Sequence, residues 1–144
     1  HNLEISFRSR RAETKAVRDV SFSLYEGETL ALVGESGCGK SVTAKALMGL
    51  LTKKEVRVAE NSRILYQGEN ILDYSEEQWR RYCGQECAMI FQDSMAALNP
   101  TIWVGKQIAE NLRIHQKITM KEAMKAAENA LEEVGISNPK RRVR

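Results

Sequence analysis

The sequence predicts a mixed α/β fold followed by a helical part. Apolar and polar residues alternate over 3–7, which is typical of a half-buried strand. The almost wholly apolar run 29–33 leads directly into a glycine-rich segment, and helical spacing of apolar residues begins at Lys40. Towards the C-terminus the apolar spacing is helical throughout. We therefore expect an incomplete α/β core over 1–92 and the beginning of a helical subdomain over 93–144.

Further strands are predicted where short apolar runs are bounded by turn residues. Residues 9–15 are polar and basic, which indicates a loop between the first strand and the next. The run 29–33 has the apolar character of a strand buried on both faces of a parallel sheet. We expect the remaining strands at 20–24, 64–66 and 87–91.

Two capping boxes predict helix starts in the second half of the chain. Ser75 with Gln78 begins a helix that we expect to run to about residue 82. Thr119 with Glu122 begins another, and Gly135 is a plausible stop for it. The dipeptide at 99–100 predicts a turn. The apolar face of the later helix consists of Ala123, Ala126, Ala127, Ala130, Leu131 and Val134.

Composition indicates an ordinary globular chain. It has 144 residues, of which 42% are hydrophobic and 28% charged, and its net charge is +3. No apolar run approaches the roughly 18 residues of a membrane span. A charge run is usually a solvated face, so we expect no nucleic-acid partner, although nucleic-acid binding through the basic tail is the alternative. The tail consists of Lys140, Arg141, Arg142 and Arg144.

The cysteines indicate reduced, cytoplasmic thiols, because their number is odd and no secretory signal precedes them. Cys83 and Cys87 could share one helix face, but no second Cys/His pair completes a metal site. We interpret Cys38 as a small filler in a loop, with a redox role as the alternative because a helix N-terminus lowers a thiol pKa.

The strongest motif is the segment Gly34–Ser41, which matches the phosphate-binding pattern G-x-x-x-x-G-K-[ST] at every fixed position. Its glycines let backbone N–H groups surround phosphate oxygens, and the following helix directs its positive end at the same anion. Lys40 can reach the β- and γ-phosphates, and the Ser41 hydroxyl can ligate Mg²⁺. A chance match is the alternative, but the strand before and the helix after favour a real site. The expected nucleotide-binding residues are Gly34, Glu35, Ser36, Gly37, Cys38, Gly39, Lys40, Ser41 and Val42.

Several segments resemble the ATPases of ABC transporters. Residues 17–22 (VRDVSF) and 26–28 (EGE) look like the lead-in to the family's phosphate loop, and 90–93 (IFQD) resembles its Q-loop. The stretch 89–100 (MIFQDSMAALNP), followed by 104–108 (VGKQI), is similar to the dipeptide/oligopeptide importer subfamily or its nickel-transporting relatives. This resemblance covers nearly the whole chain.

The resemblance implies a P-loop NTPase core with N-terminal antiparallel strands and the start of a helical subdomain. It implies ATP and Mg²⁺ as cofactors, with Gln92 and Ser41 as metal ligands. Gln92 would also position the attacking water, and Lys40 would be the second catalytic residue. The helical part would face membrane-spanning permease subunits, and a second ABC ATPase subunit would complete the site. The implied location is the cytoplasmic face of the cell membrane.

Three departures from the family pattern qualify this prediction. Ser94 stands where the family usually has proline. In the family an aromatic residue in the loop after the first strand stacks on adenine, but 9–15 contain none. Phe7 is the nearest candidate, and no stacking residue is assigned. The family's signature motif, Walker B carboxylates and switch histidine do not occur before Arg144. We therefore expect a truncated chain that binds ATP without hydrolysing it. One alternative is a nucleotide-binding module that never hydrolyses ATP. A non-transport ABC ATPase, such as a DNA-repair protein, is a weaker alternative, because the importer-like character of 89–108 argues against it.

Overall fold

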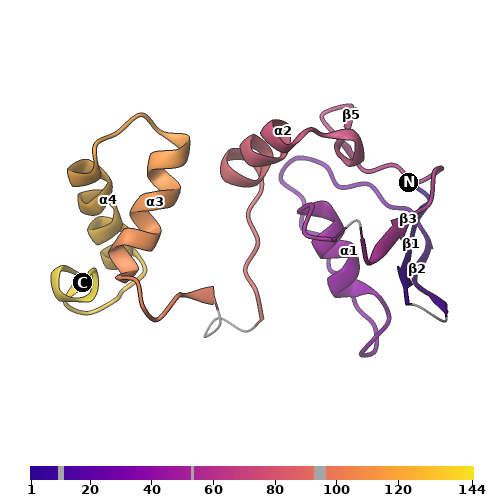
Figure 1. Cartoon of the computed structure of the whole chain (residues 1–144), viewed down its shortest axis with the longest axis horizontal. Helices are drawn as coiled ribbons and strands as arrows, with labels where there is room; N and C mark the ends of the chain where they lie inside the picture. The colour runs from indigo at the N-terminus through magenta and orange to yellow at the C-terminus, as the bar shows by residue number, and fades with distance from the viewer. Residues whose placement is uncertain (10–11, 53, 93–96) are drawn as a thin grey trace. The chain divides into compact units, whose positions relative to one another are not determined.

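The computed structural model describes residues 1–9, 12–52, 54–92 and 97–144 (Figure 1). The chain divides into two compact units, His1–Arg80 and Arg81–Arg144. The domain boundary that the sequence places after residue 92 stays a prediction. Within the described ranges, no helix combines the length and the apolar character needed to cross a bilayer.

An antiparallel three-stranded sheet forms the N-terminal part of the first unit (Figure 1). Its strands are β1 (Leu3–Arg8), β2 (Glu13–Val20) and β3 (Val56–Val58), in the order β2-β1-β3. Ile5 lies at the centre, opposite Val17 on one side and Val58 on the other. The predicted first strand is confirmed, with Leu3 and Ile5 buried. Its predicted inward face is wrong beyond Ile5, because Ser6 is buried and Phe7 is 38% exposed after a register irregularity between Ile5 and Ser6.

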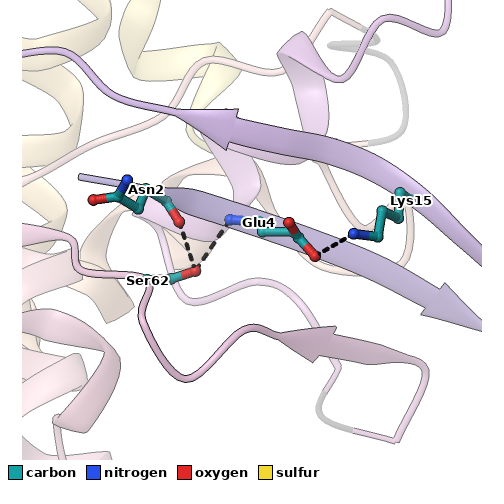
Figure 2. Close-up of polar contacts among 4 residues, drawn as sticks. All are labelled: Asn2, Glu4, Lys15 and Ser62. Carbon is teal, nitrogen blue, oxygen red and sulfur yellow. Dashed lines mark hydrogen bonds and ion pairs between the residues drawn. The ribbon is translucent and has the colours of Figure 1, made fainter.

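The end of this sheet is fastened by a buried hydroxyl (Figure 2). Ser62 Oγ donates to the carbonyl oxygen of Asn2 at 3.0 Å and accepts the N–H of Glu4 at 3.0 Å. β3 pairs with Ile5, Ser6 and Phe7 of β1. The Ser62 side chain bonds two backbone groups that precede this paired stretch, those of Asn2 and Glu4. On β2, Lys15 Nζ lies 2.7 Å from the Glu4 carboxylate, a contact that is largely exposed.

The predicted second strand is displaced along the sequence. β2 begins at Glu13, so the expected loop over 9–15 is wrong at its C-terminal end, and residues 10–11 of that loop lie outside the described residues. The expected strand at 20–24 is also wrong, because pairing stops at Val20. Val20 lies opposite Leu3, the first residue of β1, so the chain after Val20 has passed the end of its partner.

Two predicted buried strands are not observed. Residues 29–33 and 87–91 are neither assigned as strands nor buried. Val33 is 89% exposed and Ile90 97% exposed. An extended segment becomes a strand only when a neighbour takes up its N–H and C=O groups. No described strand pairs with either run, so their apolar side chains stay on the surface.

Local signals in the middle of the chain predict the structure well. β4 (Leu65–Tyr66) and β5 (Glu69–Asn70) form a hairpin whose two-residue turn confirms the predicted end of the 64–66 strand. A short 3₁₀ turn, η1 (Ile71–Asp73), follows. The 75–78 capping box is confirmed: the Ser75 N–H donates to Gln78 Oε1 at 3.0 Å, and the Gln78 N–H donates to Ser75 Oγ at 3.3 Å. The helix is α2 (Glu76–Arg81), continued by one π-helical turn, η2 (Tyr82–Glu86).

Two helices lie side by side in the second unit, α3 (Val104–His115) and α4 (Met120–Glu133) (Figure 1). Their interface contains fully buried Ala109, Ala123 and Ala127, and such small side chains let helix backbones approach closely. The capping box that starts α4 is confirmed, and so is its stop, because the Gly135 and Ile136 N–H groups close a Schellman motif onto the last turn.

The C-terminal segment docks onto the start of α3. A short helix, α5 (Pro139–Arg142), precedes Val143, which is 7% exposed. The Gly105 N–H donates to the carbonyl oxygen of Val143 at 3.0 Å. A methyl group at Gly105 would lie 2.6 Å from that oxygen, so this approach requires glycine.

Candidate phosphate-binding site

The phosphate-binding motif forms a loop that ends at the first turn of α1 (Lys40–Leu47), as predicted. Gly39 is the N-cap residue and has φ of +97°, a conformation that other residues rarely adopt. A methyl group at Gly39 would lie 2.6 Å from the carbonyl oxygen of Ala16 on β2. The loop therefore lies directly against the edge of the N-terminal sheet, and only glycine fits there.

Lys40 folds back over the loop. Its Nζ donates to the carbonyl oxygens of Gly34 at 2.6 Å and Glu35 at 2.7 Å, and it lies 3.4 Å from Cys38 Sγ. A lysine ammonium has three donors and a full positive charge. These contacts hold the charge at the mouth of the loop, where an anion held by the loop's backbone would meet it.

The first turn of α1 supplies donors for an anion. The first N–H groups of any α-helix lack intrahelical acceptors, and Gly39 has no side chain that could cap them. Ser41 is exposed, so its hydroxyl is accessible to a metal ion, whereas Val42 is half-buried and can contribute its backbone N–H. Thr43 is buried and its hydroxyl bonds back to the Gly39 carbonyl oxygen at 3.1 Å. This donor set fits the triphosphate of a nucleotide with Mg²⁺.

A cavity of about 480 Å³ lies beside the loop. β2 contributes apolar and basic side chains to it, among them Val17 and Arg18. The sequence identifies the lead-in segment 17–22 as a family feature but does not reveal that Val17, Arg18 and Val20 line the site, since only the fold brings β2 to the loop. The complete lining is Lys15, Ala16, Val17, Arg18, Val20, Leu32, Val33, Gly37, Cys38, Gly39, Lys40 and Thr43.

Gln92 belongs to the second compact unit, and the phosphate loop belongs to the first. Its side chain is exposed, and it directly follows the segment 87–91, which is not assigned as a strand. The role expected of Gln92 beside Ser41 therefore stays a prediction. Residues 93–96, which include Asp93 of the Q-loop pattern and the departure at Ser94, lie outside the described residues.

Part of the stretch that carries the importer resemblance, 99–107, forms a hydrogen-bonded turn after the Q-loop. The predicted turn at 99–100 is confirmed by the bond from the Ile102 N–H to the Asn99 carbonyl oxygen at 3.2 Å. Gln107 on α3 clamps this turn: its amide accepts the Asn99 N–H and donates to the Asn99 and Ile102 carbonyl oxygens. An adjacent cavity of about 660 Å³ is lined by Ala97, Leu98, Ile102, Gln107, Ile108, Glu110, Asn111 and Leu112.

The cysteines are not joined by disulfides. Cys83 and Cys87 are both half-buried, and burial together with the neighbouring Cys87 raises the pKa of the Cys83 thiol above its ordinary value. Among the residues that the structure describes, no group of three or more His, Cys, Asp or Glu side chains could hold a metal ion.

Comparison with known proteins decides the family. The family model described as "ABC transporter" matches residues 17–144. The chain belongs to the ABC transporter family. Membership explains the combination of an N-terminal antiparallel sheet, a phosphate loop and a following helical unit, and it confirms the predicted fold class.

Several curated ABC proteins are similar to this chain. The dipeptide transport ATP-binding protein DppD of Lactococcus lactis is 48% identical over 136 residues, which cover 94% of this chain and 38% of the relative. DppD of Bacillus subtilis is 46% identical over 143 residues, covering 99% of this chain and 42% of the relative. The glutathione import ATP-binding protein GsiA of Escherichia coli K12 is 46% identical over 139 residues, covering 94% and 22%. The chain thus spans about two fifths or less of these relatives' length.

Proposed function

We propose that the protein is the ATP-binding subunit of an ABC importer for peptides or a related small solute. The observation that carries this proposal is the Lys40 ammonium, held over the Gly34 and Glu35 carbonyl oxygens at the N-terminal end of α1. The similarity to peptide and glutathione import ATP-binding proteins supports the substrate class.

In the proposed site, the loop's backbone N–H groups surround the phosphates and Lys40 binds the β- and γ-phosphate oxygens. Ser41 and Gln92 would hold Mg²⁺, which when bound neutralises negative charge on those oxygens. Gln92 would also orient the attacking water. Arg18 of β2 adds positive charge to the cavity and so favours a polyanionic ligand.

The proposed partners are membrane-spanning permease subunits at the cytoplasmic face of the membrane and a second ABC ATPase subunit. The cavity beside the Gln107 clamp supports a docking role for the helical unit, because Leu98 and Ile102 are 47% and 42% exposed there. Replacing Leu98 with lysine is expected to reduce co-purification of the intact protein with its permease. Val134→Lys is the matched control, because Val134 is an exposed apolar residue that does not line this cavity.

The 144 residues alone are expected to bind ATP without hydrolysing it, since the family's Walker B carboxylates do not occur in their sequence. Transport by the intact protein tests the main proposal. Uptake of labelled dipeptide into vesicles that carry the reconstituted transporter should require ATP and should be abolished by Lys40→Ala. If the intact protein binds ATP but supports neither dipeptide uptake nor ATP hydrolysis, that result would instead favour the non-hydrolysing nucleotide-binding module.

A further inference from the structure

We propose that Trp79 is a positioning residue for the phosphate loop and that its indole responds to nucleotide binding. This inference rests on the proposed ATP site. Trp79 lies on α2 and contacts the C-terminal end of α1, whereas the phosphate loop lies at the N-terminal end of the same helix.

The contact is close and specific. α1 ends in a Schellman motif, with the Gly49 N–H on the Ala46 carbonyl oxygen at 3.1 Å and the Leu50 N–H on the Lys45 carbonyl oxygen at 2.9 Å. A methyl group at Gly49 would lie 2.8 Å from Trp79 Cε3 and 2.9 Å from Cδ2 and Cζ3. The indole therefore lies on the backbone of the helix end, and Gly49 must lack a side chain for both its φ of +63° and this contact.

The indole is held from its own side as well. Tyr74 packs against Trp79 with ring centroids 5.8 Å apart and an interplanar angle of 72°. The Tyr74 hydroxyl donates to Glu69 Oε2 on β5 at 3.2 Å. The 75–78 capping box fixes the start of α2. The indole is thus held by the β4–β5 hairpin and α2, and its contact with Gly49 fixes the C-terminal end of α1 against them.

α1 is short enough for this contact to affect the loop. Its eight residues span about 12 Å at a rise of about 1.5 Å per residue. A tilt of α1 about Gly49 therefore moves Lys40 at the other end of the helix, by a distance that grows with the tilt angle and the helix length. Because Lys40 acts through hydrogen bonds, whose strength falls steeply with distance and angle, the position of α1 controls how well the loop holds a phosphate.

The first test uses fluorescence of the full 144-residue chain. Trp79 and Trp103 are its two tryptophans, so Trp103→Phe leaves Trp79 as the sole reporter. Titration with ATP and Mg²⁺ should change Trp79 emission with a midpoint equal to the calorimetric Kd. Adding Lys40→Ala should abolish the change. Calorimetric binding with no change in Trp79 emission or in its quenching by acrylamide overturns the inference and leaves the ATP site intact.

The second test separates positioning from stability. Trp79→Ala should weaken ATP binding about five- to tenfold, and Trp79→Phe should recover most of the affinity. Val56→Ala is the control, because Val56 is buried on β3 in the same unit and does not line the loop cavity, so its loss should leave the affinity of the folded chain within about twofold. Equal affinity for Trp79→Ala and wild type overturns the inference. If Trp79→Ala does not fold, the fluorescence titration decides. A folded wild-type chain that gives no calorimetric binding overturns the proposed function and this inference together.

Discussion

The Cα of Gly39 faces the carbonyl oxygen of Ala16 so closely that a methyl group there would lie 2.6 Å from that oxygen. Gly39 is the last residue before α1, and Ala16 lies on β2. This approach joins the N-terminal sheet to the phosphate loop. It also explains why the cavity beside the loop has a wall made of β2 residues.

Gly39→Ala is therefore expected to reduce both stability and ATP affinity. The substitution combines left-handed strain of about 1–2 kcal/mol with the overlap on Ala16. Gly37→Ala is the matched control, because Gly37 has φ of +84° but no atom within 4 Å of its added methyl group. Denaturant unfolding and ATP titration measure both effects. Equal losses for the two variants would show that the Ala16 contact carries no energetic weight.

Ser62→Ala should destabilise the first unit by about 1–3 kcal/mol, because the Asn2 carbonyl oxygen and the Glu4 N–H each lose a partly buried hydrogen bond. Ser62 is 1% exposed. Ser21→Ala is the control: the Ser21 hydroxyl also accepts a β1-flanking N–H, that of Asn2 at 2.7 Å, but it is exposed and should cost less than about 0.5 kcal/mol. Urea denaturation monitored by circular dichroism compares them, and a Ser62 cost as small as that of Ser21 contradicts the role assigned to the buried bridge.

Gly105→Ala should release α5 from α3. The added methyl group would overlap the carbonyl oxygen of Val143, so we expect a loss of about 1–3 kcal/mol and faster hydrogen exchange over 139–143. Gly135→Ala places its methyl group in open space, so its cost is the backbone strain at φ of +78° at the end of α4, and it should raise that exchange less than Gly105→Ala does. Unaltered exchange over 139–143 in Gly105→Ala would contradict the close approach of the two segments.

The capping box of α4 should make stability depend on pH. Hydrogen bonds from the Thr119 side chain, and then from its backbone N–H, lower the pKa of Glu122 below its ordinary value of 4.5. A carboxyl whose pKa is depressed by folding stabilises the native state above its unfolded pKa, and this contribution is lost as the pH falls through the folded pKa. Wild type should thus exceed Glu122→Gln in stability at pH 7 and lose that advantage on acidification below 4.5. Urea titrations across this range measure the difference, and a pH-independent gap would count against the assignment.

Sequence reasoning succeeded where a few neighbouring residues determine the structure. The capping boxes at 75–78 and 119–122 and the stop at Gly135 each involve contacts within one or two turns, so residue types at fixed spacing suffice to predict them. The phosphate loop is likewise contiguous, and its start of α1 at Lys40 was predicted to the residue.

The failures have a common cause, which is that strands depend on distant partners. The apolar run 29–33 has the composition of a buried strand, but composition does not say which segment pairs with it, and no described segment does. In β2, polar Glu13 is recruited into a strand because it lies opposite Arg8 across an exposed face. The position of Arg18 in the cavity lining cannot be read from the sequence for the same reason, since the contact between β2 and the loop is tertiary.

The central claim is that Gly34–Ser41 binds the phosphates of ATP through Lys40. Calorimetric titration of the 144-residue chain with ATP and Mg²⁺, beside Lys40→Ala and Lys45→Ala, tests it most directly. Lys45 is an exposed lysine in the last turn of the same helix, so Lys45→Ala also removes one positive charge, but at a site away from the loop. The account predicts saturable binding for wild type and Lys45→Ala, and a loss of at least about tenfold in Lys40→Ala, because charge-assisted hydrogen bonds are worth about 1.5–3 kcal/mol. Equal affinity in Lys40→Ala, or no binding by a folded wild-type chain, would contradict it.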